Sequence, residues 1–285
     1  PVFGWGLLWW CGIGLREIEL YLAGRHEPFG VLGFAALSGW LAGLSGRRLD
    51  WTAMGRTTLA LLPVLIVIAL LLFESSRYPH PAYDWGWWAW PLALGVQLWI
   101  LRSGTQHWPL VFSSLWHAGG FLLLVFLGTW QIAWGVDQLA AGGRAWPMLM
   151  WGAVPALSLL LMMNFGSRIR WPVNAFPDAY LGSGLVPLAA FLLLWTLYGC
   201  IEEGNPAPLP YLPIVNPLDL VQLLCLYTLV RWWRKPGVSN PAAAAALSQV
   251  LPAAIALGAF AWLNALVART VHFWAGVPFT WNSLH

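Results

Sequence analysis

Three residues near the end of the sequence have side chains that can do chemistry at a membrane surface. Asn264, Arg269 and His272 fall within a sector of about 140° if one helix carries them all. An amide, a permanent cation and a titratable imidazole on one sector can bind an anion such as phosphate and move a proton. An interfacial arginine that reaches the lipid headgroups, with a hydrated histidine beside it, explains the same residues equally well.

A second polar stretch runs over residues 210–219 and predicts the start of a helix. Asn216 suits the N-cap, Pro217 the first helical position, and Asp219 the third, where an acid lies beside the positive helix end. Gln222 shares a helix face with Asp219, so a polar stripe would enter the membrane there. Capping is the favoured interpretation of this stretch. Asp219 and His272 are nevertheless the candidate catalytic residues, and Asn264, Arg269 and Gln222 are candidate ligand-binding residues.

Glu17 and Glu19 follow the first apolar run of the sequence. In an extended loop, carboxylates two residues apart would be aimed the same way. Membrane glycosyltransferases that use lipid-linked sugars place acids in such a loop, as base or metal ligand. Glu17 and Glu19 are therefore further ligand-binding candidates, although a solvated charge cluster at the membrane interface is the favoured explanation.

The composition decides which elements must position these residues. Of the 285 residues, 59% are hydrophobic and only 9% are charged, and the mean hydropathy is +0.66. A water-soluble domain carries about 25% charged residues, so this chain lacks the polar surface to cover one. Soluble enzymes, disordered tails, coiled coils and disulfide-stapled secreted domains are excluded, and the sequence predicts a polytopic membrane protein.

A helix needs about 20 apolar residues to cross the hydrocarbon core. Nine runs approach that length, at residues 1–15, 28–46, 56–73, 85–101, 110–135, 145–165, 180–201, 217–233 and 248–268. Residues 271–285 form a tenth apolar segment, either an interfacial helix or a further crossing. The sequence thus predicts an all-α fold, a transmembrane bundle of about nine or ten spans. Because the joining loops are short, we expect residues 1–285 to form a single multi-pass domain, and a start at Pro1 suggests a fragment of a longer protein.

Lys and Arg favour cytoplasmic loops. Loops after even-numbered spans carry nine of them, against five after odd-numbered spans. This places the even loops in the cytoplasm and all three polar stretches on the outer side. The basic residues are scattered between apolar runs, so no nucleic-acid partner is expected. The sequence has no metal-ligand spacing and no cofactor motif, and its three cysteines are far apart, so no metal and no cofactor are expected.

The C-terminal motifs resemble a known family. They are Asn216-Pro217-Leu218-Asp219-Leu220, then Trp262-Leu263-Asn264-Ala265, Arg269-Thr270-Val271-His272 and Trp274-Ala275-Gly276-Val277-Pro278. Together they are similar to a bacterial family of large predicted membrane proteins, domain of unknown function 2339. The resemblance implies a many-spanning protein of which this chain is a C-terminal portion. Phe273 stands where many members have a second histidine.

The leading hypothesis is a bacterial inner-membrane bundle with an outward-facing polar pocket that binds or acts on cell-envelope lipid or glycan intermediates. Asp219, Asn264, Arg269 and His272 would line the pocket, with Arg269 holding the phosphate of a lipid-linked ligand. Two alternatives stay open: a non-enzymatic membrane scaffold or assembly protein, and part of a transporter. The expected partners are the lipid bilayer, a phosphate-bearing ligand and other membrane proteins.

Overall fold

The computed structural model describes residues 2–22, 24–103, 108, 110–139, 145–234 and 241–279. Every regular element in these ranges is helical, which confirms the all-α prediction. Each of the nine apolar runs coincides with a helical segment. Internal contacts divide the chain into two units, residues 1–123 and 124–285, and each is described by itself. The expectation of one domain over the whole chain stays a prediction.

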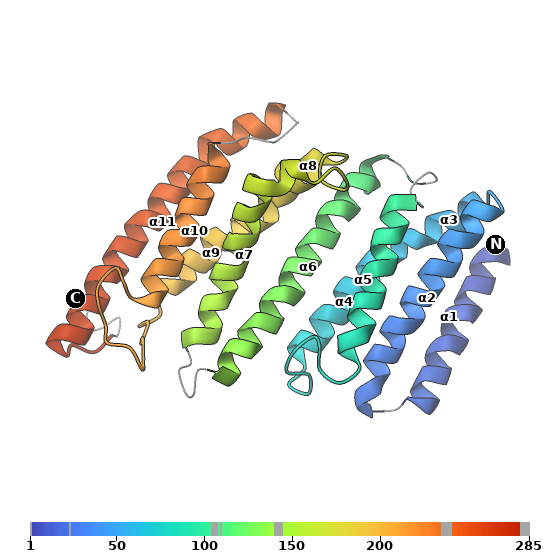
Figure 1. Ribbon diagram of the computed structural model, residues 1–285, viewed down its shortest axis with the longest axis horizontal. Coiled ribbons are helices and arrows are strands. Elements are labelled where there is room, and N and C mark those ends of the chain that lie inside the picture. The colour runs from blue at the N-terminus through green and yellow to red at the C-terminus, as the bar shows by residue number, and fades with distance from the viewer. Residues whose placement is uncertain are drawn as a thin grey trace. The chain divides into compact units, whose positions relative to one another are not determined.

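The first unit is built around α2 (Glu27–Arg48). This helix packs against α1 (Val2–Tyr21), α3 (Thr52–Thr57), α4 (Leu61–Glu74) and α5 (Gly86–Ser103) (Figure 1). Gly39 and Gly43 of α2 lie against Leu61 and Trp99, so the missing side chains let α4 and α5 approach closely. Short 3-10 helices precede α2 (η1, Gly24–His26) and α4 (η2, Thr58–Ala60). α1 buries none of its own residues.

The boundary between the units falls inside α6 (Leu110–Leu139). The second unit contains α7 (Ala145–Phe165), η4 (Gly166–Arg168), α8 (Pro177–Leu181), η5 (Ser183–Leu185), α9 (Val186–Gly199), α10 (Pro217–Trp233) and α11 (Pro241–Ala275). α10 is central to it, because it packs against α7, α9 and α11. The candidate functional residues of α10 and α11 therefore lie on adjacent helices.

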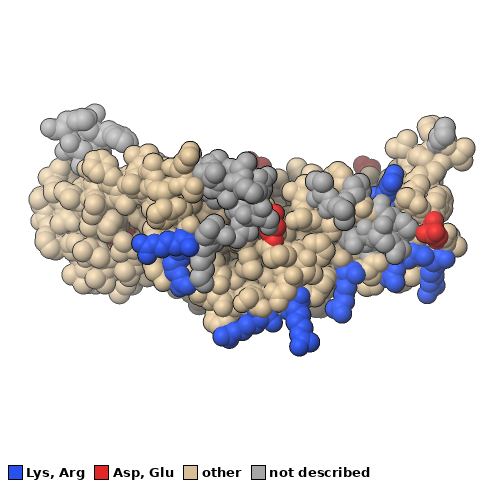
Figure 2. Space-filling model, turned by 90° about the horizontal axis from the view of Figure 1, so that it is seen from above, with Lys and Arg blue, Asp and Glu red and all other residues tan. Residues whose placement is uncertain are grey.

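Six helical segments in the described ranges are long and apolar enough to cross a membrane. They are Gly24–Arg48, Thr52–Glu74, Phe112–Leu139, Ala145–Arg168, Pro177–Gly199 and Ser248–Ala275. The helices α1, α5 and α10 coincide with the other three predicted spans but do not meet this criterion; α10 has only 17 residues. Neutral residues make up most of the face shown in Figure 2, with isolated Lys and Arg side chains projecting from it.

Two local predictions need correction. Glu17 and Glu19 do not lie in an extended loop, because α1 continues to Tyr21. Residues two apart on a helix point about 160° away from each other, so the two carboxylates are not aimed the same way. The predicted tenth segment begins inside α11, which ends at Ala275; residues 276–279 are not helical, and residues 280–285 lie outside the described residues.

Candidate functional site

Arg269 of α11 is the centre of a polar cluster inside the second unit. Its side chain is completely buried, with 0% exposure. Nη1 donates hydrogen bonds to Asp219 Oδ1 at 2.5 Å and to Gln222 Oε1 at 3.0 Å. Nε donates to the carbonyl oxygen of Glu202 at 3.1 Å, and Nη2 donates to the carbonyl oxygen of Gly199. All three guanidinium nitrogens are therefore engaged within the protein.

α10 contributes two side chains to this cluster from one face. Asp219 and Gln222 are three residues apart and form the polar stripe that the sequence predicts. Both side chains are fully buried. The amide nitrogen Nε2 of Gln222 also donates to the carbonyl oxygen of Thr196 in α9, at 2.8 Å. Hydrogen bonds of one cluster thus connect α9, α10 and α11.

Two glycines allow the segment after α9 to pass close to this cluster. A Cβ atom on Gly199 would lie 2.8 Å from Nε2 of Gln222. Gly204 has a φ of +66°, in the left-handed region that side chains disfavour. A Cβ there would lie 2.9 Å from Leu218 Cδ2 and 3.1 Å from Asn216 Nδ2. Glycine at both positions keeps the backbone carbonyls within reach of the cluster.

The predicted start of α10 is confirmed. Asn216 is the N-cap, and its side-chain oxygen accepts a hydrogen bond from the backbone N–H of Leu218 at 3.4 Å. Pro217 is the first helical residue. The amide nitrogen of Asn216 donates to the carbonyl oxygen of Gly204 at 3.1 Å. The cap therefore fixes both the helix start and the segment that leads to it.

Replacing the cap gives a first testable prediction. Asn216→Ala should lower the free energy of unfolding by about 1–2 kcal/mol, because the cap bond and the bond to Gly204 are both lost. Asn264→Ala is the matched control: its amide is exposed and, among the described residues, donates to Phe260 of its own helix, so a change within about 0.5 kcal/mol is expected. Unfolding in detergent followed by circular dichroism measures both, and equal losses would contradict the role of the cap.

A buried ion pair fixes the relative position of two helices, but the protein is strongly destabilised if one of the two charges is lost. Removing the charge of either partner would leave the other charge buried and uncompensated. Here the amide of Gln222 and two backbone carbonyls complete the shell of Arg269. One carboxylate oxygen, Asp219 Oδ2, is buried without a hydrogen-bond partner among the described residues. Four of the five N–H groups of the guanidinium thus donate to acceptors of the protein.

His272 lies three residues beyond Arg269, toward the end of α11, and is partly exposed. Its Nδ1 is 2.7 Å from the carbonyl oxygen of Val277. Its Nε2 is 3.9 Å from Glu203 Oε2, and the two side chains are 24% and 52% exposed. We call His272 and Glu203 the rim pair. Unlike Arg269, these two side chains are accessible to a molecule outside the protein.

Phe273, at the position of the expected second histidine, has a packing role. Its ring stacks on Tyr211 with a centroid distance of 4.4 Å. The Tyr211 hydroxyl is 3.4 Å from Thr270 Oγ1. Burial raises the pKa of Tyr211 above its ordinary value. This packing fixes the segment before α10 against the end of α11.

The structure thus brings together only some of the candidate residues. Asp219, Gln222 and Arg269 are in direct contact, and His272 lies at the rim. Asn264 is exposed, with its amide bonded to Phe260 of its own helix at 2.7 Å. Glu17 and Glu19 are exposed residues of α1 in the first unit. Among the residues that the structure describes, no group of three or more His, Cys, Asp or Glu side chains could hold a metal.

Sequence analysis missed a second charged cluster, which lies in the first unit. Asp84 Oδ2 is 3.2 Å from Nε of Arg25 and 2.8 Å from Nδ1 of His26. The contact between His26 and Asp84 is a short distance without hydrogen-bond geometry. Neither His26 Nδ1 nor Asp84 Oδ2 has a hydrogen-bond partner among the described residues. The His26 ring stacks on Trp85 at 4.6 Å. This cluster links η1 to the segment before α5. His26 and Asp84 are 58 positions apart in the sequence, and no spacing rule connects residues at that separation.

Three comparisons with known proteins bear on this chain. The family model described as "Predicted membrane protein (DUF2339)" matches residues 2–285. The match covers nearly the whole chain and not only the C-terminal third that carries the motifs. No curated protein and no solved structure matches the chain.

Proposed function

Because the chain belongs to the DUF2339 family of predicted membrane proteins, we propose that it is a non-catalytic scaffold in a bacterial inner membrane, on which other membrane proteins assemble. The observation that supports this most is the engagement of Arg269. All three of its nitrogens bond to acceptors within the second unit. Arg269 therefore has the contacts expected of a residue that fixes helices, and its side chain is fully buried.

The packing of the second unit is consistent with this role. Holding α9, α10 and α11 in one arrangement presents the outer faces of these helices in fixed positions. On α11 those faces include Leu257 and Phe260, which are 60% and 65% exposed. Exposed apolar side chains of a membrane protein meet either lipid or another membrane protein. A scaffold uses part of such a surface for its partners.

A second candidate is the binding of cell-envelope lipid or glycan intermediates. The rim pair favours it, because His272 and Glu203 could exchange a proton with a phosphate or sugar hydroxyl. The polar pocket would then lie at the rim and have Asp219 and Arg269 as its buried floor. Arg269 is fully buried and donates four hydrogen bonds within the second unit, so a phosphate could bind it only in exchange for protein groups that now surround it. That exchange makes the lipid site the less favoured of the two.

Two variants separate the candidates. Asp219→Leu with Arg269→Met removes both buried charges together, and His272→Ala removes the rim imidazole alone. A photo-crosslinking amino acid at Phe260 reports neighbours in intact cells, and native mass spectrometry of the extracted protein reports bound lipids. The scaffold proposal expects the same protein crosslinks and the same lipids from the unmodified protein and both variants.

Two results would contradict the scaffold proposal. A phosphate-bearing lipid that binds the unmodified protein and is lost in His272→Ala would establish the second candidate. Absence of any reproducible protein crosslink from Phe260 would overturn the scaffold proposal. Circular dichroism of each variant shows that the comparison is made between folded proteins.

A further inference from the structure

Helix α1 has two opposite faces, and the contacts that it makes with other described residues of the first unit involve one of them. Trp10 stacks on Phe34 at 5.8 Å and donates a hydrogen bond from its indole nitrogen to Ser38 Oγ at 2.9 Å. A Cβ atom on Gly14 would overlap the Phe34 ring, so this part of α1 lies directly against α2. Every contact in this set involves the same side of α1.

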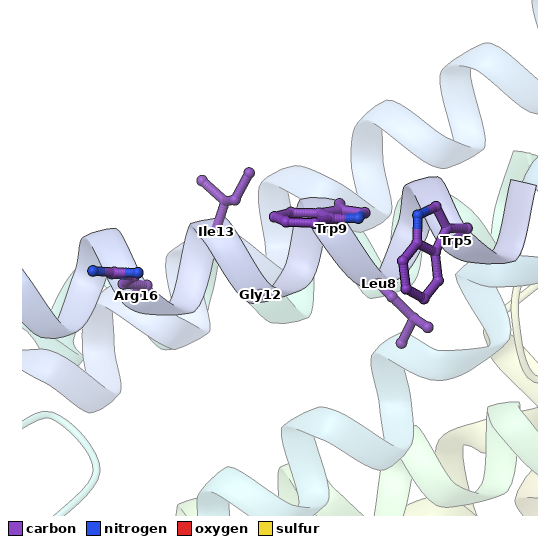
Figure 3. Close-up of a pocket in the computed structure, with 6 residues that line it drawn as sticks. All are labelled: Trp5, Leu8, Trp9, Gly12, Ile13 and Arg16. Atoms are coloured by element: carbon purple, nitrogen blue, oxygen red, sulfur yellow. The ribbon is translucent and has the colours of Figure 1, made fainter.

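The opposite side of α1 carries a shallow pocket. Its lining residues are Trp5, Leu8, Trp9, Gly12, Ile13 and Arg16, all from α1 (Figure 3). At about 100° per residue, Gly12 points about 160° away from Trp10, and Arg16 about 120° away. Gly12 has no side chain, and nothing lies within 4 Å of the position that its Cβ atom would take, so the surface of α1 is recessed there. We call the side that these six residues form the outer face of α1.

Arg16 of the outer face has a residue of opposite charge beside it. Glu19 follows Arg16 by three residues, so the two lie on the same side of the helix. Both are exposed. Among the residues that the structure describes, neither has an ion-pair partner within 4.0 Å. Opposite charges on one exposed side of a helix are complementary to a partner that presents the same two charges in reverse, and a second copy of α1 presents them.

We propose that the outer face of α1 binds the same face of a second copy of this chain. Copies inserted with the same topology have parallel α1 helices, related by a twofold axis along the membrane normal. In that arrangement Arg16 of each copy faces Glu19 of the other, which pairs all four charges. Gly12 lies at the point of closest approach, where a missing side chain lets two backbones come together. The outer face together with Glu19 is then self-complementary in charge.

Disulfide formation in native membranes tests this arrangement. Gly12→Cys in a Cys11→Ser background should form a covalent dimer when the membranes are oxidised. The unmodified chain supplies the matched control, because Cys11 is also exposed and lies at the same depth, but about 100° around the helix from Gly12. Cys11→Ser alone gives the background from the two remaining cysteines. A disulfide-linked dimer of the Gly12→Cys variant, without one in the unmodified chain, is the expected result.

A charge swap tests the ion pairs. In the Gly12→Cys variant, Arg16→Glu places acids opposite acids and Glu19→Arg places bases opposite bases, so either change should lower the dimer yield about fivefold. Both changes together restore opposite charges and should restore the yield, which a mere folding defect would not do.

Three outcomes would overturn the proposal. The first is no dimer of the Gly12→Cys variant, and the second is a crosslink from its new thiol only to another protein. The third is a dimer yield that does not change with the charge swap. Because it concerns the first unit alone, this inference is independent of the scaffold proposal. Crosslinks from position 260 and from position 12 can each fail without the other.

Discussion

Arg269→Ala is expected to lower the free energy of unfolding by about 3–5 kcal/mol, the usual consequence of leaving one member of a buried ion pair without its partner. Asp219 would stay fully buried, opposite an empty space. The carbonyl oxygens of Gly199 and Glu202 would lose their donor as well. A thiol-reactive fluorogenic dye can follow unfolding in detergent, because Cys225 is buried in α10. Cys11→Ser removes the exposed thiol from all the proteins compared.

The double variant Asp219→Leu with Arg269→Met provides the control. Replacing both charges by apolar groups of similar size is often neutral, or stabilising by about 1–4 kcal/mol. The double variant should therefore unfold at a much higher temperature than Arg269→Ala. If the single variant were as stable as the unmodified protein, the ion pair would not hold α10 and α11 together.

Gly86→Ala is expected to have the second largest effect, in the first unit. A Cβ atom on Gly86 would overlap the carbonyl oxygen of Pro81 and lie 3.0 Å from Cε1 of Phe29. The carbonyl belongs to the backbone that leads into α5, and Gly86 is itself tied to Tyr83 by a backbone hydrogen bond of 2.8 Å. No side-chain rotation can relieve this clash. A loss of about 1–3 kcal/mol or more is expected.

Gly95→Ala, on the same helix, gives the matched control. Nothing lies within 4 Å of its Cβ position. Alanine is a better helix former than glycine by about 0.5–1 kcal/mol, so this variant should be slightly more stable. Loss of helical circular dichroism on addition of SDS measures both variants. The SDS concentration at which the helical signal is lost should fall for Gly86→Ala and rise for Gly95→Ala. Equal shifts of that concentration would mean that the close approach at Gly86 is unimportant.

The composition and hydropathy of the chain were enough to predict an all-α fold and the approximate positions of its long helices. Local rules also located the start of α10, because an N-cap, a proline and an acid have fixed positions relative to a helix end. The same reasoning failed at Glu17 and Glu19. Charged residues are compatible with the end of a membrane helix, so α1 continues through both of them to Tyr21.

The candidate site could be predicted only in part, for a physical reason. Helical spacing places Asp219 and Gln222 on one face and singles out Arg269 as the charged residue of α11. That they meet depends on how α10 and α11 pack, and the sequence contains no spacing rule across 50 residues. The other acceptors of Arg269 are backbone carbonyls, which every residue has. Side-chain identity gives no signal for such partners.

The ion pair also has a consequence for how the chain is made. Asp219 leaves the ribosome 50 residues before Arg269, an interval of roughly 3–10 s at about 5–20 residues per second. During that interval α10 has a carboxylate but not its countercharge, so its entry into the lipid is unfavourable until α11 arrives. The two helices are therefore expected to leave the translocon together, and a nascent chain interrupted between them would be a natural substrate for membrane quality control.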